Sequence, residues 1–257
     1  MGIYLRQICL VAHQLDPVIA ALKDVFCLNT AYIDDEVAHF GLENTLLGIG
    51  TQCLEVVAPV QANTAAGRYL DRLGGDGGYM VIGQVLSQAE QDACRARAAE
   101  NDVRVAFERA QSDWRLMQLH PRDMQAAFFE IDWEAPCDPK GHWSPAGGTA
   151  WLEQVNRNHV QAIKGVTLES RDPLALAGLW SRIAGAPLEL AGEIATVALE
   201  DAVLRFVANT DIPHPRLTGV SLQASDPIGI RHRAAARGLD HAETAVRIGG
   251  VWFDFKG

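Results

Sequence analysis

One short pattern recurs along the chain: an apolar strand, then Asp-Pro, then a helical segment. Residues 165–173 read Gly-Val-Thr-Leu-Glu-Ser-Arg-Asp-Pro, and residues 219–227 read Gly-Val-Ser-Leu-Gln-Ala-Ser-Asp-Pro. A shorter copy ends at Asp16-Pro17, and a degenerate copy begins at Gly78 and leads into a polar helix expected over residues 87–100. Because Asp is favoured at the N-cap and Pro at the first helical position, the pattern predicts helices that start at these pairs.

Each copy of the pattern is followed by short apolar segments that alternate as strands do. Examples are residues 52–58, 126–133, 202–208 and 250–255. The repeating unit is therefore one strand, one helix and about three strands. Four units fit the chain, starting near residues 5, 77, 163 and 217, which predicts an α+β fold of four βαβββ modules.

A stretch rich in Pro and Gly follows residue 134 and separates the second module from the third. Such a composition is typical of a linker. We therefore expect an N-terminal domain over residues 1–133, a linker over 134–162 and a C-terminal domain over 163–257, with two modules in each domain.

Composition and charge exclude several function classes. The formal net charge of −10 argues against a nucleic-acid binder and against a polybasic membrane-surface protein. The five cysteines are widely spaced without a CxxC pair, so neither a disulfide scaffold nor a zinc finger is expected. The chain opens without a signal-peptide pattern and has no apolar run long enough for a membrane span, so we expect a cytoplasmic protein without a membrane partner.

Three segments resemble the vicinal oxygen chelate superfamily, which includes glyoxalases, methylmalonyl-CoA epimerases, extradiol dioxygenases and bleomycin-resistance proteins. They are Leu54–Pro59, Ala65–Met80 and Leu119–Glu130. The resemblance covers nearly the whole chain and is closest to a glyoxalase-like domain protein. It implies that two βαβββ modules pair into a cupped half-barrel around one site, so that four modules form two tandem half-barrels.

The resemblance also implies a site in the N-terminal cup. The positions that hold a metal in relatives read Gln7, Glu55, Tyr79 and Glu130 here. Most active relatives have His where this chain has Tyr79, and a neutral phenol is a poor ligand. Gln7, Glu55 and Glu130 would then hold one divalent cation, such as Mg²⁺, Mn²⁺, Ni²⁺ or Zn²⁺, and their oxygen atoms favour the harder ions.

Such an ion would polarise a carbonyl oxygen of the substrate, and a glutamate such as Glu130 could move a proton. Tyr79 could donate a hydrogen bond to a developing oxyanion. His13 shares strand parity with Gln7, so we expect it to point into the same cup as an acid–base group. The alternative is that these are inward-facing polar residues, and His13 a structural one.

The corresponding positions of the second half are Gly165, Arg205, Gly219 and Phe253, which cannot make a metal site. This half is expected to be a structural partner. A sharper hypothesis is that Arg205, opposite a wall formed by Phe253, binds a carboxylate or phosphate of the substrate.

Three functions remain open from the sequence. The first is a metal-assisted lyase or isomerase that acts on a small oxygenated carbonyl compound. The second is a protein that binds a small molecule without chemistry, as bleomycin-resistance proteins do. The third is a structural or regulatory homodimer with a decayed site. Retention of Glu55 and Glu130 favours the first, and the loss of His at position 79 favours the others.

Overall fold

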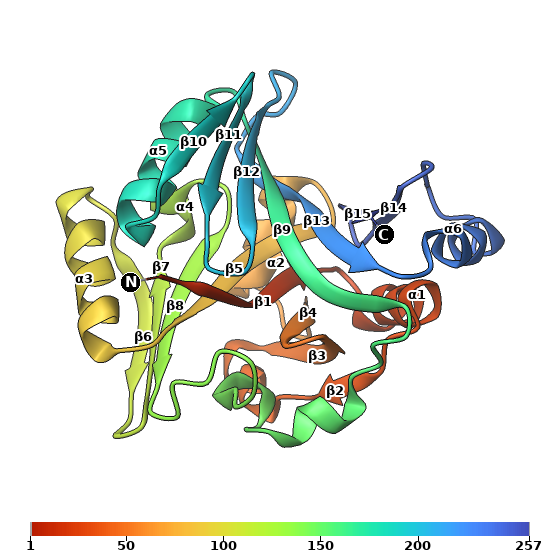
Figure 1. Cartoon of the computed structure of the whole chain (residues 1–257), viewed down its shortest axis with the longest axis horizontal. Coiled ribbons are helices and arrows are strands. Elements are labelled where there is room, and N and C mark those ends of the chain that lie inside the picture. The colour runs from red at the N-terminus through yellow and green to blue at the C-terminus, as the bar shows by residue number, and fades with distance from the viewer. Residues whose placement is uncertain (1, 257) are drawn as a thin grey trace. The chain divides into compact units, whose positions relative to one another are not determined.

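The computed structural model describes residues 2–256 and contains two mixed β-sheets of eight and seven strands with helices packed on them (Figure 1). The strands of the first sheet are β1 (Tyr4–Val11), β2 (Thr30–Tyr32), β3 (Leu42–Ile49), β4 (Gln52–Pro59), β5 (Gly77–Val85), β6 (Val105–Ala110), β7 (Trp114–Leu119) and β8 (Phe128–Glu134). Those of the second sheet are β9 (Val160–Ser170), β10 (Leu188–Ala191), β11 (Ile194–Ala198), β12 (Val203–Ala208), β13 (Arg216–Ala224), β14 (Ala245–Ile248) and β15 (Val251–Lys256). The predicted α+β glyoxalase-like fold is confirmed.

The helices occur in the order that the predicted βαβββ modules require. The α-helices are α1 (Leu15–Phe26), α2 (Ala65–Leu73), α3 (Gln88–Glu100), α4 (Pro121–Met124), α5 (Pro173–Ala184) and α6 (Pro227–Ala236). Three short 3₁₀ helices are η1 (Asp35–Phe40), η2 (Ser144–Ala146) and η3 (Ala150–Gln154). In each module a first strand leads into the long helix α1, α3, α5 or α6, and two or three strands follow it.

The chain forms two compact units that do not follow the chain order. Unit 1 contains residues 1–7, 79–144 and 165–217, and unit 2 contains residues 8–78, 145–164 and 218–257. In unit 1 the strand orders are β1-β5-β8-β7-β6 and β10-β11-β12-β9, and in unit 2 they are β2-β3-β4-β1 and β9-β13-β15-β14. Strands β1, β5, β9 and β13 each have residues in both units.

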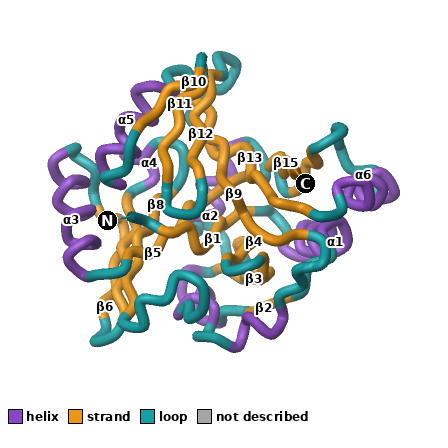
Figure 2. The backbone as a smooth tube through the Cα atoms, in the orientation of Figure 1, coloured by secondary structure: helices purple, strands orange, loops and turns teal. Residues whose placement is uncertain are grey.

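Unit 1 is held together by the packing of α3 against α5, which lie side by side in Figures 1 and 2. Arg97 of α3 donates from Nε to the Ile183 carbonyl oxygen (2.9 Å) and from Nη2 to that of Ala184 (3.2 Å), at the C-terminal end of α5. The last carbonyl groups of a helix lack partners within the helix, so this arginine satisfies groups that otherwise need water. Below the helices, the ring of Trp180 stacks on Phe129 of β8 with 4.8 Å between centroids.

Unit 2 repeats this arrangement with α1 and α6, which also lie side by side (Figure 1). Arg233 of α6 donates from Nε to the carbonyl oxygen of Val25 (2.9 Å), near the C-terminal end of α1. The ring of Phe26 lies 5.3 Å from that of Phe253 on β15. In both units, therefore, an arginine of one helix bonds carbonyl groups near the C-terminal end of the other helix, and an aromatic pair joins a helix to the sheet.

The Asp-Pro pairs behave as predicted in two of three copies. Asp172 and Asp226 are the N-caps of α5 and α6, and their carboxylates accept from the backbone N–H of Ala175 (3.0 Å) and Gly229 (2.9 Å). The prediction for Asp16 is wrong, because α1 begins at Leu15 with Gln14 at the N-cap. Asp16 lies inside the first turn, where a negative charge is favourable but forms no cap.

The segment expected as a linker, 134–162, contains the end of β8, the 3₁₀ helices η2 and η3, and the start of β9. Its residues up to 144 belong to unit 1 and those from 145 to unit 2. The first sheet uses strands from residues 4–134 and the second uses strands from residues 160–256. The division into two domains by chain order stays a prediction. Among the described residues, no helix is long and apolar enough to span a membrane.

The two kinds of Asp-Pro pair predict different losses of stability. Replacing Asp172 by Ala removes a capping hydrogen bond and is expected to lower the free energy of unfolding by about 1 kcal/mol. Asp16→Ala removes only a charge near the helix N-terminus and is expected to cost about 0.3 kcal/mol. Urea unfolding of both variants measures the difference, and equal losses would contradict the helix start that the structure assigns to α1.

Candidate functional site

Gln7 lies in the interior of unit 1, on β1, and is 3% exposed. Its side-chain oxygen Oε1 accepts a hydrogen bond from the indole Nε1–H of Trp143 at 3.0 Å. Trp143 is fully buried, and the guanidinium carbon of Arg6 lies 4.7 Å from the centroid of its ring. The predicted ligand Gln7 is therefore held by a tryptophan from the loop that follows β8.

Glu55 lies on β4 in unit 2 and is 6% exposed. Its Oε1 accepts from the amide Nδ2 of Asn44 at 2.7 Å, and the Oδ1 of Asn44 accepts from the backbone N–H of Asp34 at 3.0 Å. The second bond fixes which end of the Asn44 amide faces Glu55, because a backbone N–H only donates. Glu55 is thus a buried carboxylate with a defined orientation.

Glu130 lies on β8 in unit 1 and is 3% exposed. In the parallel pairing of β5 with β8, its Cα partner is Ile82, and Phe128 is the partner of Met80. Side chains alternate between faces along a strand, so Met80, Ile82 and Phe128 share the face of Glu130. Tyr79 precedes Met80 and is out of phase with it along β5, but its ring meets the ring of Phe128 edge-on, with 5.0 Å between centroids.

The face of β8 that carries Glu130 also carries two further acids, Asp132 and Glu134, both fully buried. Burial raises the pKa of Asp132 well above its ordinary value, and the charges of Glu130 and Glu134 raise it further. The N–H groups of Trp114 and Met117 oppose this shift, but neither Asp132 oxygen forms a hydrogen bond of good geometry within residues 2–256. Asp132 is therefore favoured as a neutral carboxylic acid beside Glu130.

The Glu134 carboxylate binds the loop that follows it. Its Oε2 lies 2.8 Å from Nδ1 of His142, and its Oε1 accepts from the backbone N–H of Ser144. Arg6 reaches the same loop and donates to the carbonyl oxygens of Asp138 (2.7 Å), Gly141 (3.3 Å) and His142 (3.1 Å). Sequence analysis missed this arrangement, although a charged residue inside an apolar strand segment was a signal for it.

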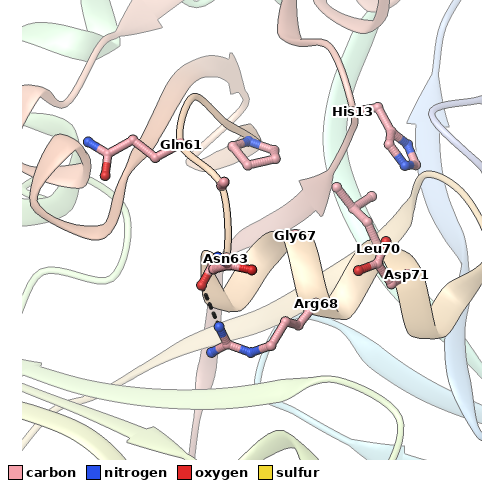
Figure 3. Close-up of a pocket in the computed structure, with 9 residues that line it drawn as sticks. His13, Gln61, Asn63, Gly67, Arg68, Leu70 and Asp71 are labelled. Carbon is pink, nitrogen blue, oxygen red and sulfur yellow. Dashed lines mark hydrogen bonds between the residues drawn. The ribbon is translucent and has the colours of Figure 1, made fainter.

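His13 does not lie on β1, contrary to the prediction from strand parity, because the strand ends at Val11. Its side chain is 59% exposed, and its Nδ1 lies 2.8 Å from Oδ1 of Asp76. It lines a pocket of about 180 Å³ together with residues of α2 and the preceding loop. Figure 3 shows His13 on one side of this pocket and Asn63 and Arg68 on the other. None of the other predicted site residues lines it.

The two predicted substrate-binding residues of the second half lie in different units. Arg205 is half-buried on β12 in unit 1, where its Nη1 would lie 3.3 Å from a Cβ at Gly165. Phe253 is fully buried on β15 in unit 2 and packs on Phe26 of α1. That position is typical of a core residue and leaves the ring no surface for a ligand. Binding by Arg205 stays a prediction.

The predicted metal ligands are likewise divided, with Gln7 and Glu130 in unit 1 and Glu55 in unit 2. Their convergence stays a prediction. Within residues 2–256, no group of three or more His, Cys, Asp or Glu side chains is placed to hold a metal ion. The set Gln7, Glu55 and Glu130 includes only two such residues, so that observation leaves it open.

Several solved structures share the fold of this chain. The Mn(II)-bound glyoxalase from Novosphingobium aromaticivorans has a TM-score of 0.68 and 12% sequence identity, over 99% of this chain and 81% of that one. A hypothetical protein from Staphylococcus aureus has a TM-score of 0.66 and 14% identity, over 99% of each chain. A mutant of 4-hydroxymandelate synthase from Streptomyces coelicolor has a TM-score of 0.62 and 15% identity, over 93% of this chain and 76% of that one. At these identities the likeness shows the glyoxalase-like fold alone.

The sequence itself assigns the family. The glyoxalase-like domain family matches residues 8–184, more than half of the chain. The chain therefore belongs to this family, as the resemblance in its sequence predicted. A search of curated protein sequences found no significant match.

The hairpin that leads to Glu130 contains an ion pair with a testable pH dependence. Arg104 donates from Nε and Nη2 to Asp123 of α4 at 2.8 Å each, and these bonds lower the pKa of Asp123 from 3.8 to about 2. A carboxyl group with a lowered pKa stabilises the fold above its ordinary pKa, and the contribution is lost as the pH falls toward the lowered value. We expect the stability of the unchanged protein to exceed that of Asp123→Asn above about pH 4, and the difference to shrink toward pH 2. Urea unfolding at several pH values measures it, and a difference that stays constant would exclude this role of the ion pair.

Proposed function

We propose that this protein is a metal-assisted lyase or isomerase that acts on a small oxygenated carbonyl compound at the first sheet. One observation carries the proposal: Gln7, Glu55 and Glu130 are oxygen-bearing side chains that are only 3%, 6% and 3% exposed. Burying two carboxylates is costly, because each loses its hydration. A divalent cation shared by them would offset that cost.

The chemistry of the three side chains fits a hard divalent ion such as Mg²⁺ or Mn²⁺, which prefers carboxylate and amide oxygens. Met80, which shares the face of Glu130, supplies a thioether that such ions bind poorly. We therefore expect weaker binding than in a site with a fourth nitrogen or oxygen ligand from the protein. When bound, the ion would supply Lewis acidity toward a carbonyl oxygen of the substrate.

In this proposal Glu130 moves the proton. Its carboxylate takes a proton from the carbon next to the carbonyl group, the electron pair of that C–H bond forms a carbon–carbon double bond, and the carbonyl oxygen takes the negative charge. Where the first carbon carries a hydroxyl group, return of the proton to the former carbonyl carbon gives an isomer, as the hydroxyl proton passes to the oxyanion and a new carbonyl group forms on the first carbon. Where the carbon beyond the first carries a leaving group, re-formation of the carbonyl group expels that group with its bonding electron pair and gives a lyase product. The neutral form favoured for Asp132 avoids a second negative charge next to the one on Glu130.

Assisting roles for Tyr79 and His13 have less support. Tyr79 is out of phase with Ile82, the strand partner of Glu130, and its ring packs on Phe128. His13 lies beyond the end of β1, bonded to Asp76. The cytoplasmic location stays part of the proposal, and five free cysteines agree with a reducing compartment. A homodimer also stays a prediction.

Metal analysis of the untagged protein tests the function. We expect close to one divalent ion per chain, and loss of that ion in the double variant Glu55→Gln/Glu130→Gln. Glu169→Gln is the matched control, because Glu169 is a part-buried glutamate whose carboxylate accepts from the side-chain amide of Asn209 at 2.8 Å and has no part in the proposed site. This control should keep the ion and lose only stability. A protein that stays metal-free after incubation with Mg²⁺, Mn²⁺, Ni²⁺ and Zn²⁺ would refute the metal-assisted mechanism.

The second candidate function is non-catalytic binding of a small molecule. It is favoured by Met80, which presents a thioether on the face of Glu130 rather than a nitrogen or oxygen ligand for a metal ion. A metal-free protein that binds small aromatic or apolar compounds, without turnover of vicinal carbonyl and hydroxy compounds, would support this candidate over the first.

A further inference from the structure

We propose that Trp143 and Arg6 are positioning residues for Gln7, so that the loop over residues 135–144 completes the ligand site. This inference rests on the proposed function and adds two residues to it. An indole N–H can donate a hydrogen bond but cannot accept one. The 3.0 Å contact from Nε1 of Trp143 therefore identifies the bonded atom of Gln7 as the amide oxygen. An amide oxygen has two lone pairs, and a hydrogen bond to one of them fixes the direction of the other.

A hydrogen bond to a ligating group restricts its rotation and fixes the direction of its lone pairs. A glutamine side chain has three rotatable bonds, and ordering it for a ligand costs conformational entropy. In this structure the Gln7 oxygen is already ordered by Trp143. The conformational entropy of the Gln7 side chain is therefore lost when the chain folds rather than when the ligand binds.

Arg6 explains why the indole is in place. Its guanidinium group is fully buried and lies over the Trp143 ring at 4.7 Å, a favourable cation–π distance. The same group donates to the backbone carbonyl oxygens of Asp138, Gly141 and His142, and to the side-chain oxygen of Gln84. Residues 138–142 are thus tied to β1 directly before Trp143.

The other end of the loop is fixed by Glu134, the last residue of β8. It binds Nδ1 of His142 and the backbone N–H of Ser144, the two neighbours of Trp143 in sequence. Two anchors therefore hold the indole from both sides, one on the strand of Gln7 and one on the strand of Glu130. A loop that served only as a linker between domains would not need a buried arginine and a buried glutamate.

The first arm of the test is an NMR measurement on the metal-free protein. Trp143→Phe assigns the indole N–H signal of Trp143 among the six tryptophans. We expect Gln7→Leu, which removes the acceptor, to shift this signal upfield and to speed its exchange with water. Gln7→Glu keeps an acceptor oxygen. In this variant the Trp143 N–H should keep the chemical shift and the slow exchange with water that it has in the unchanged protein. A Trp143 signal that does not respond to Gln7→Leu would overturn the inference, whether or not the protein binds metal.

The second arm measures the affinity for Mn²⁺ by its electron spin resonance signal. Trp143→Phe keeps an aromatic ring for Arg6 but removes the N–H, and is expected to weaken Mn²⁺ binding about 10- to 100-fold. Trp180→Phe is the matched control: Trp180 is also fully buried and donates its indole N–H, but to the carbonyl oxygen of Met124 at 3.1 Å. It should lose stability and keep its Mn²⁺ affinity.

Equal Mn²⁺ affinities of Trp143→Phe and the unchanged protein would overturn the inference while leaving the proposed function intact. Failure of the unchanged protein to bind any Mn²⁺ would instead refute the proposed metal function. The NMR arm then decides alone whether Trp143 positions Gln7.

Discussion

The buried guanidinium group of Arg6 organises the polar side of unit 1. It lies on β1 next to Gln7, contacts Gln84 of β5, and binds three carbonyl oxygens of the loop after β8. A buried charge loses its hydration, and these hydrogen bonds from the two Nη atoms offset part of that cost. Together with Glu134, this residue holds the loop that carries Trp143, the donor to Gln7.

Much of the fold was predictable because the local signals agree with the global pattern. The Asp-Pro pairs at 172–173 and 226–227 start α5 and α6, and the strands expected near 52, 126, 202 and 250 correspond to β4, β8, β12 and β15. The loop over residues 135–144 was interpreted as a linker, because its Pro and Gly content is that of a linker. Its actual order comes from Arg6, more than 120 residues away in sequence, and composition carries no information about such a contact.

The candidate site was predictable in residue type but less so in orientation. Burial of Gln7, Glu55 and Glu130 agrees with the inward-facing positions expected of them. Tyr79 illustrates the limit, because a shift of one residue along a strand moves a side chain to the other face, and only the register with β8 decides between Tyr79 and Met80. His13 fails for a related reason: parity applies within a strand, and β1 ends two residues before it. Trp143 could not be assigned a role until its partner Gln7 was known.

Strand β8 shows why the fold does not determine the reaction. Phe129 lies on one face of this strand and stacks on Trp180, and thereby binds β8 to α5. Glu130, Asp132 and Glu134 lie on the opposite face, away from that contact. Substitutions on the acidic face can therefore change the chemistry while the packing of the helices stays the same. The function of this protein has to be inferred from the acidic face and its hydrogen bonds, because one fold hosts different activities.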